Sequence, residues 1–295
     1  MLCKIYRRVE MAIIKNEPLS KHCSFKIGGP ADIFIIPDSK ENLIQEVNSL
    51  KGTPIKFLGG GTNILVSDEG FKGAVIKTSS LNNIKMLDNN ILYAEAGANL
   101  SSTALYACDL DLYGFIFAAG IPGTVGGAVC MNSGAFGSEI SEILVSCDVL
   151  IDGMVHTFSC DDMQYGYRKS IIQKNQGAIL SACFQLREGD KFYIKSELEK
   201  NANHRKERQP LNSLSAGSTF KRATGHYTGK LIQDSGLKGF SIGGASVSEK
   251  HAGFIINKGN ATAKDVYNLI NHVIETVYNK FGVKLQPEIQ FWGNI

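Results

Sequence analysis

The sequence predicts an α+β protein built from two or three domains. Its 295 residues are too many for most single hydrophobic cores. Near the N-terminus a strand, a helix and a second strand follow one another, as in a βαβ unit, whereas two later strands form a predicted antiparallel hairpin. From about residue 80 to residue 186 the chain therefore has the pattern of a second α+β domain.

The βαβ unit begins with the apolar strand at residues 33–36. Asp38 is expected to cap the helix that follows, with Glu41 in the return position of a capping box. Apolar residues at helical spacing give this helix one buried face. The second strand, residues 55–58, runs directly into three glycines, and strand ends in α/β folds commonly receive ligands.

The predicted hairpin lies at residues 145–158. Asp152-Gly153 separates two apolar runs there, and this dipeptide favours a two-residue type I′ turn. The other expected elements are strands at 74–78, 91–94 and 178–186, helices at 101–109, 195–208 and 228–235, a helix that starts at Thr262 with Asp265 and ends at Gly282, and a closing strand pair at 283–285 and 289–292.

The composition is that of a globular protein without a nucleic-acid partner. Hydrophobic residues make up 43% of the chain and charged residues 20%, which is neither a disordered nor a membrane composition. The 31 basic and 28 acidic residues give a net charge of +3, too balanced to require nucleic acid. The seven cysteines are scattered and include no C-x-x-C pair, so we expect reduced thiols and no metal site.

The N-terminal residues 1–18 are expected to form a loosely held arm. The apolar patch at residues 11–14 is too short for a secretory signal, which favours a cytoplasmic protein with no membrane partner. Three basic residues of this arm, Lys4, Arg7 and Arg8, are expected to be a solvated face rather than a binding patch.

The longest uncharged stretch, residues 113–137, is also the richest in glycine. Its glycines and Pro122 would make a poor membrane helix, so we expect a buried loop. Such glycines let backbone N–H groups approach a ligand, and a flat aromatic cofactor carrying a diphosphate would suit the lining. The expected cofactor contacts are Gly120, Ile121, Pro122, Gly123, Thr124, Gly126, Gly127, Ala128, Gly134 and Gly137.

A second glycine loop lies at residues 56–68. Gly59, Gly60 and Gly61 follow an apolar strand, and Thr62 and Asn63 then offer free side-chain donors, which together form an anion nest. The loop lacks both the Lys-Ser/Thr ending of a nucleoside-triphosphate loop and the spacing of a dinucleotide fingerprint. Either loop alone could be a glycine-rich turn inside a core, but two of them favour a large diphosphate cofactor.

Eight blocks of sequence occur in a fixed order between residues 19 and 292: SFKIGGPAD, LGGGTNILVSDEGFKG, GIPGTVGGAVCMNSGAFG, YGYRKS, SAGSTFKR, KLIQDSGLKGF, VSEKHAGFIIN and LQPEIQFWG. In this order they resemble the UDP-N-acetylenolpyruvoylglucosamine reductase family, MurB, in its shorter subclass without a substrate-clamping insertion. The resemblance implies a two-domain FAD-binding fold of the vanillyl-alcohol oxidase (PCMH) type plus a C-terminal α+β substrate-binding domain. We place these domains at residues 1–79, 80–208 and 209–295.

The resemblance also implies an NADPH-dependent flavoprotein, UDP-N-acetylmuramate dehydrogenase. In this family, hydride passes from NADPH through non-covalent FAD to the enolpyruvyl group of UDP-N-acetylglucosamine enolpyruvate, giving UDP-N-acetylmuramate for peptidoglycan. The family pattern assigns Arg168 and Glu288 to stabilising the enolate and Ser218 to donating the proton. An ionised Glu288 would repel an enolate, so its role requires a neutral or proton-sharing carboxyl group.

Other residues are weaker candidates. Tyr167, Lys221 and Arg222 are expected substrate contacts, since cations suit a diphosphate, whereas His251 is either a substrate contact or a structural histidine. The mixed charges of residues 204–208, HRKER, favour a solvated linker helix over a phosphate contact. Gln290 stands where family members often carry a basic residue, and we exclude it from the site.

Two other functions remain open from the sequence. One is an oxidase on the same scaffold, which would often tether its flavin through a histidine or cysteine; Cys130 is the nearest such residue to the glycine loops. The other is a nucleotide-binding protein without redox chemistry, in which the glycine loops only hold a ligand.

Overall fold

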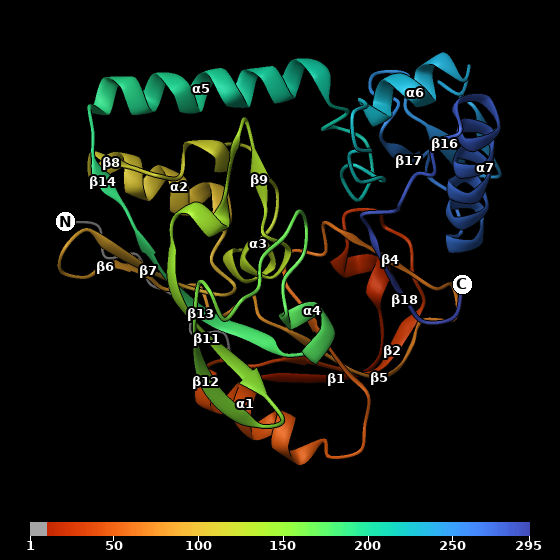
Figure 1. Ribbon diagram of the computed structural model, residues 1–295. Coiled ribbons are helices and arrows are strands. Elements are labelled where there is room, and N and C mark those ends of the chain that lie inside the picture. Colours follow the sequence, from red (N-terminus) through yellow and green to blue (C-terminus); the bar gives the residue numbers. More distant parts are fainter. Residues whose placement is uncertain (1–10) are drawn as a thin grey trace.

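The computed structural model describes residues 11–295, and its first layer is a four-stranded sheet (Figure 1). The strand order is β1-β2-β5-β3, with β1 antiparallel to β2 and the other three strands parallel. The predicted βαβ unit is confirmed, and β5 lies between its two strands. The bounds are β1 Ala12–Pro18, β2 Pro30–Ile36, α1 Lys40–Ser49, β3 Ile55–Leu58 and β5 Phe71–Lys77.

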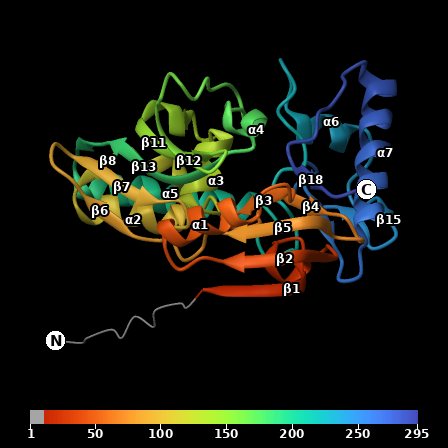
Figure 2. The same ribbon diagram turned by 90° about the horizontal axis from the view of Figure 1, so that it is seen from below.

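The prediction of a loosely held N-terminal arm is wrong for residues 12–18. These residues form β1, which lies alongside β2 in Figure 2 and pairs with it from Ala12 opposite Ile36 to Pro18 opposite Pro30. Most side chains of β1 are exposed. Backbone pairing at a sheet edge therefore holds this strand, and composition does not reveal such pairing. Lys4, Arg7 and Arg8 lie outside the described residues.

The cap of α1 also differs from the prediction. Ser39, not Asp38, is the N-cap residue, and its Oγ accepts a hydrogen bond from the Asn42 N–H at 3.1 Å. This shift by one residue places Asn42 at the third helical position. Glu41 is then out of register for a capping box, so the predicted box does not form.

A second sheet has five antiparallel strands in the order β12-β11-β13-β7-β6. The predicted hairpin joins β11 and β12, because Asp152 and Gly153 have φ values of 50° and 78°, both positive as a type I′ turn requires. Three longer helices and the four-residue helix α4 (Ile172–Asn175) share one buried core with this sheet. The bounds are β6 Ile84–Met86, β7 Ile91–Glu95, α2 Leu100–Asp109, α3 Val125–Met131, β11 Leu144–Ile151, β12 Met154–Ser159, β13 Ala178–Gln185 and α5 Lys191–Arg208.

The C-terminal part contains a small antiparallel sheet, β15-β16-β17, and two helices. The capping box predicted for the last helix is present between Thr262 and Asp265, and Gly282 ends the helix with a φ of 68°. The predicted apolar face is buried at Val266, Leu269, Ile270, Val273 and Val277. The bounds are α6 Thr228–Asp234, β15 Ser241–Ile242, β16 Ala245–Val247, β17 Ile255–Asn257 and α7 Ala263–Phe281.

The predicted closing strand pair is wrong, because the last strand pairs elsewhere. β18 (Gln290–Trp292) runs parallel to β4 (Ile64–Val66), which follows the three glycines at residues 59–61, and residues 283–285 form no strand. Figure 1 shows the two strands side by side between the first sheet and the C-terminal helices. This pairing brings the chain around Glu288 back to the glycine loop, where the Gln290 N–H donates to the Asn63 carbonyl at 2.9 Å.

The C-terminal part and the first sheet share one hydrophobic core. Phe34 and Leu65 of the first part belong to the same buried cluster as Val266 and Leu269 of α7. The division at residues 79 and 208 stays a prediction.

The remaining elements of residues 11–295 are short. They are the strands β8 Leu112–Tyr113, β9 Gly134–Ala135, β10 Ser138–Glu139 and β14 Arg187–Glu188, the helix α4 Ile172–Asn175, and 3₁₀ turns at Leu19–His22, Ile116–Ala118 and Ile140–Glu142. In this part of the chain, no helix is both long enough and apolar enough to cross a bilayer.

Candidate active site

A cavity of about 720 Å³ lies where the two glycine loops meet the C-terminal part. Most of the predicted cofactor contacts line it, and Gly137 does not. Arg168, Ser218 and Glu288 line it as well, although they are distant in the sequence. The lining includes Gly59, Gly60, Gly61, Thr62, Asn63, Gly120, Ile121, Pro122, Gly123, Thr124, Gly126, Gly127, Ala128 and Gly134.

The two glycine loops touch each other so closely that side chains are excluded. A Cβ atom at Gly59 would lie 2.5 Å from the Thr124 Oγ1, and one at Gly60 would lie 3.0 Å from the Gly123 Cα. Gly123 also has a φ of +131°, which favours glycine. Larger residues at these positions would force the two loops apart.

The side-chain donors that the sequence predicted to be free are engaged. The Thr62 Oγ1 donates to the Pro122 carbonyl at 3.2 Å, and the Asn63 Nδ2 donates to the Glu288 carbonyl at 3.3 Å. These two bonds tie the glycine loop at residues 56–68 to the loop at residues 113–137 and to the C-terminal segment. Their role in this structure is therefore to hold the cavity walls together.

The YGYRKS segment is fixed on the C-terminal end of α3. The last carbonyl groups of a helix have no partner within the helix, so other groups must satisfy them. The Tyr165 hydroxyl donates to the Val129 carbonyl at 2.9 Å, and the Ser170 hydroxyl donates to the Cys130 carbonyl at 2.6 Å. Arg168 lies between these two anchors, with a positive φ of 54°.

The guanidinium group of Arg168 joins the loop between β12 and α4 to the C-terminal part. Its Nε donates to the Glu288 Oε1 at 3.1 Å, and its two terminal nitrogens donate to the carbonyls of Asn132 at 3.1 Å and Gly134 at 2.6 Å. The two side chains are mostly buried, with exposed fractions of 17% and 16%. Burial raises the pKa of Glu288, although the charge of Arg168 acts in the opposite direction.

Ser218 is brought to this pair by backbone bonds of its neighbour. The Glu288 N–H donates to the Thr219 carbonyl at 2.8 Å, and the Thr219 N–H donates to the Gly253 carbonyl at 2.8 Å. Ser218, which directly precedes Thr219, is exposed and lines the cavity. A cation, a carboxyl group with a raised pKa and a hydroxyl group therefore border one space.

Arg205 on α5 is a cavity residue that the sequence did not predict. It is only 9% exposed, and its Nε has no hydrogen-bond partner among residues 11–295. Burial and the charge of Arg168 lower its pKa to about 10. The prediction of a fully solvated HRKER segment is thus wrong at this position. The helical spacing of Ile194, Leu198, Asn201 and Arg205, all buried, was the signal that could have identified it.

The predicted substrate residues lie outside the cavity lining. Tyr167 is half exposed, and its hydroxyl accepts the Arg222 N–H at 3.4 Å. The Arg222 guanidinium lies 4.6 Å from the Tyr227 ring. The Lys221 N–H donates to the Gln286 carbonyl. The His251 Nδ1 accepts the Gly253 N–H at 3.1 Å, which favours the structural role. Burial lowers the pKa of His251.

Cys130 lines the cavity, but its thiol is poorly suited to covalent attachment. Burial raises its pKa to about 11, whereas nucleophilic cysteines have a lowered pKa. Among residues 11–295, no group of three or more His, Cys, Asp or Glu side chains could hold a metal ion.

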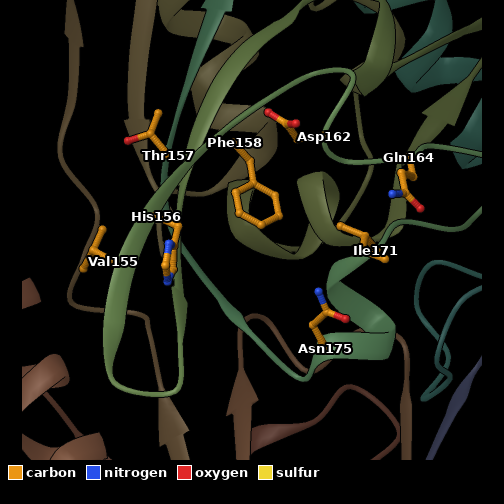
Figure 3. Close-up of a pocket in the computed structure, with 8 residues that line it drawn as sticks. All are labelled: Val155, His156, Thr157, Phe158, Asp162, Gln164, Ile171 and Asn175. Carbon is orange, nitrogen blue, oxygen red and sulfur yellow. The ribbon is translucent and has the colours of Figure 1, made fainter.

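A second hollow, of about 740 Å³, lies on the surface beside the edge strand β12. Figure 3 shows Phe158 across from Ile171 and Asn175, with His156 and Asp162 at the margins. This hollow contains neither glycine loop nor an arginine. It therefore lacks the features that make the first cavity a candidate active site.

This chain is similar to known proteins over nearly its full length. A curated relative from Caldanaerobacter subterraneus subsp. tengcongensis, named UDP-N-acetylenolpyruvoylglucosamine reductase, is 50% identical over 281 residues, covering 94% of this chain and 93% of the relative. The chain belongs to the UDP-N-acetylenolpyruvoylglucosamine reductase family. A relative of the same name from Clostridium botulinum (strain Eklund 17B) is 45% identical and covers 99% of this chain and 96% of its own length.

Domain and structure comparisons extend this result. Residues 31–159 match the FAD binding domain model, and residues 209–292 match the model of the UDP-N-acetylenolpyruvoylglucosamine reductase C-terminal domain. The crystal structure of the reductase (MurB) from Thermus caldophilus superposes with a TM-score of 0.82 at 30% identity, covering 96% of this chain and 99% of that one. The predicted fold, an FAD-binding unit of the PCMH type plus a C-terminal α+β domain, is confirmed.

The cavity suits FAD in two respects. The touching glycine loops expose backbone where a Cβ would otherwise stand, as a diphosphate cradle requires. Arg205 adds a buried cation whose Nε has no hydrogen-bond partner among the described residues. An anionic group would accept a hydrogen bond from this Nε. The residues that would hold FAD are therefore the two glycine loops together with Arg205.

Proposed function

We propose that this chain is an FAD-dependent reductase that converts UDP-N-acetylglucosamine enolpyruvate to UDP-N-acetylmuramate, with NADPH as the hydride donor. The observation that carries the proposal is the buried Arg168–Glu288 pair, which borders one cavity with Ser218 and both glycine loops. The product would serve peptidoglycan synthesis and hence cell-wall biogenesis, cell shape and division. We also propose a cytoplasmic location, in keeping with the free cysteines of the described residues.

When bound, FAD supplies the hydride that it receives from NADPH. The new C–H bond forms at the β-carbon of the enolpyruvyl group, and the electron pair of the double bond moves to the α-carbon and into the carboxylate. Arg168 stabilises this developing charge because its guanidinium is already fixed by two carbonyls and Glu288. Ser218 then delivers a proton to the α-carbon, completing the reduction.

Glu288 acts in its neutral form in this proposal. A buried neutral carboxyl group can donate a hydrogen bond to the enolate, whereas an ionised one would repel it. The raised pKa of Glu288 supports this role, because it extends the pH range over which the group stays protonated.

Glu288 therefore predicts a pH dependence of substrate reduction. Because its pKa is raised, the neutral form predominates at low pH and is lost as the pH rises through that pKa. The rate of substrate reduction should therefore fall as the pH rises through the pKa of Glu288. Glu288→Gln keeps an acceptor for the Arg168 Nε and a neutral donor, so its rate should stay within about tenfold of the wild type and lose the alkaline fall. An alkaline fall that persists unchanged in Glu288→Gln would rule out this carboxyl group as its source.

Removing the charge of Arg205 should specifically weaken the binding of FAD. Arg205→Met keeps the apolar stem but removes the buried cation, and a hydrogen bond to a charged group is worth about 1.5–3 kcal/mol. The Kd for FAD should therefore rise by about 10- to 100-fold in a fluorescence titration of the apoprotein. Arg208→Met, an exposed arginine on the same helix, is the matched control and should leave the Kd unchanged. Equal effects of the two variants would argue against a cofactor contact.

The proposed function is tested by mass spectrometry of the product. Purified protein carrying FAD should consume NADPH only when the enolpyruvyl sugar is present, and the sugar should gain two hydrogen atoms. Oxygen consumption without the sugar, together with a yellow pellet after acid precipitation, would favour the oxidase. A protein that cannot be reconstituted with FAD would favour a nucleotide-binding role without redox chemistry.

A further inference from the structure

We propose that Asn132 and Glu139 are positioning residues that hold the Arg168 guanidinium in its working orientation. The inference rests on the proposed function, since it concerns how the cation of that site is fixed. It starts from Asn132, which is fully buried (0% exposed) although its side chain is polar. A buried amide of this kind is stable only when its hydrogen bonds are made.

Asn132 ends α3 and adopts a left-handed conformation, with φ 46°. Its backbone carbonyl accepts a hydrogen bond from Arg168 at 3.1 Å. Its side-chain Oδ1 accepts the Ser141 N–H at 3.0 Å, and its Nδ2 donates both to the Glu139 Oε1 at 2.8 Å and to the Gly166 carbonyl at 3.3 Å. The residue therefore contacts Arg168 directly and also contacts both segments that surround it.

The first of these segments is the β9–β10 hairpin. Glu139 pairs with Gly134 across this hairpin, and the Gly134 carbonyl is the second backbone acceptor of the Arg168 guanidinium. The Glu139 carboxylate also accepts the Ser141 hydroxyl at 2.8 Å, so its Oε1 has two donors. The bond from Asn132 to Glu139 thus fixes where the Gly134 carbonyl stands.

The second segment is the tight turn that carries Arg168. Gly166 and Lys169 exchange backbone hydrogen bonds of 3.0 Å and 3.1 Å, and Arg168 lies inside this turn. The Asn132 Nδ2 bonds to the Gly166 carbonyl at the start of the turn. One amide group therefore holds both the backbone of Arg168 and a carbonyl that its guanidinium contacts.

The residue types suit this role. Asparagine tolerates a left-handed backbone and offers a donor and an acceptor on one short side chain. Aspartate would place a second carboxylate against Glu139 and leave the Gly166 carbonyl with the Lys169 N–H as its one remaining donor of these two. Glycine would keep the backbone conformation and remove only the side-chain bonds, which makes Asn132→Gly the cleanest deletion.

The test compares the two half-reactions of the protein carrying FAD under anaerobic conditions. Asn132→Gly should leave flavin reduction by NADPH unchanged and should slow reoxidation by the enolpyruvyl sugar by about 10- to 100-fold, because a misplaced catalytic group costs that much. When Arg168 is already replaced by lysine, adding Asn132→Gly should slow reoxidation no further. If Asn132 had a purely structural role, the double variant would instead show the product of the two single-variant losses in rate.

Exchanging donor and acceptor provides a rescue. Asn132→Asp alone should slow reoxidation more than Asn132→Gly does, and the double variant Asn132→Asp/Glu139→Gln should recover part of the lost rate because the glutamine amide can donate to the new carboxylate. Asn257→Ala is the matched control: Asn257 is also buried and bonds to the Phe25, Gly259 and Ala261 backbone. It should lower the Tm without changing the ratio of the two half-reaction rates.

The outcomes separate this inference from the function on which it rests. If the wild-type flavin is not reoxidised by the enolpyruvyl sugar, the proposed function fails. If the wild type reacts and Asn132→Gly reoxidises equally fast, or if its loss multiplies with that of Arg168→Lys, the positioning role is overturned while the function stands. The positioning role is supported if Asn132→Gly slows reoxidation alone, if this loss is absent in the Arg168→Lys background, and if Asn132→Asp/Glu139→Gln recovers part of the rate that Asn132→Asp loses.

Discussion

Arg168→Met should slow substrate reduction by about 100- to 1,000-fold, the cost of removing a fixed charge-stabilising donor from an active site. The variant loses the cation that faces the developing enolate, and it also leaves Glu288 buried without its partner. Flavin reduction by NADPH should stay at the wild-type rate, because that step creates no enolate. Anaerobic stopped-flow absorbance of the flavin measures the two steps separately.

Arg168→Lys is the control for this prediction. Lysine keeps the positive charge, but a single ammonium group cannot reproduce the planar fork that contacts Glu288, Asn132 and Gly134 together. Its rate should therefore fall between those of the wild type and Arg168→Met. Equal loss of both half-reactions in Arg168→Met would instead indicate a role in folding or cofactor binding.

Ser218→Ala should slow substrate reduction by roughly 100-fold or more, as expected for a proton donor, with flavin reduction unchanged. A serine hydroxyl is a weak acid, but the α-carbon of an enolate is basic enough to accept its proton. Ser218→Cys retains a transferable proton and should recover part of the rate. Ser213→Ala, which removes another hydroxyl of the cavity lining, serves as the control. A wild-type reoxidation rate in Ser218→Ala would exclude this hydroxyl as the donor.

Local signals in the sequence were sufficient for several elements of the fold. The Asp152-Gly153 turn and the Thr262–Asp265 capping box depend on residues close together in the chain, and both are present. The two glycine loops together favoured a diphosphate cofactor, although either loop alone is also typical of a turn inside a core. That the loops touch could not be predicted, since contact between Gly59 and Thr124 is a property of the fold.

Strand pairing that the sequence does not reveal accounts for two of the errors in the fold. β18 pairs with β4 across more than two hundred residues, and nothing near Gln290 indicates that partner. β1 is an exposed edge strand whose side chains carry no strong pattern. The prediction that Arg205 is solvated is wrong for a different reason. The charges around Arg205 are typical of a solvated helix, and its spacing from Ile194 and Leu198 is what places it on the buried face.

The most direct test of the central claim is an anaerobic titration followed at the flavin absorbance. With FAD in the cavity beside Arg168, Ser218 and Glu288, NADPH should bleach the flavin, and one equivalent of the enolpyruvyl sugar should restore its colour without oxygen. A flavin that NADPH bleaches but that only oxygen can reoxidise would contradict the assignment of these three residues to substrate reduction.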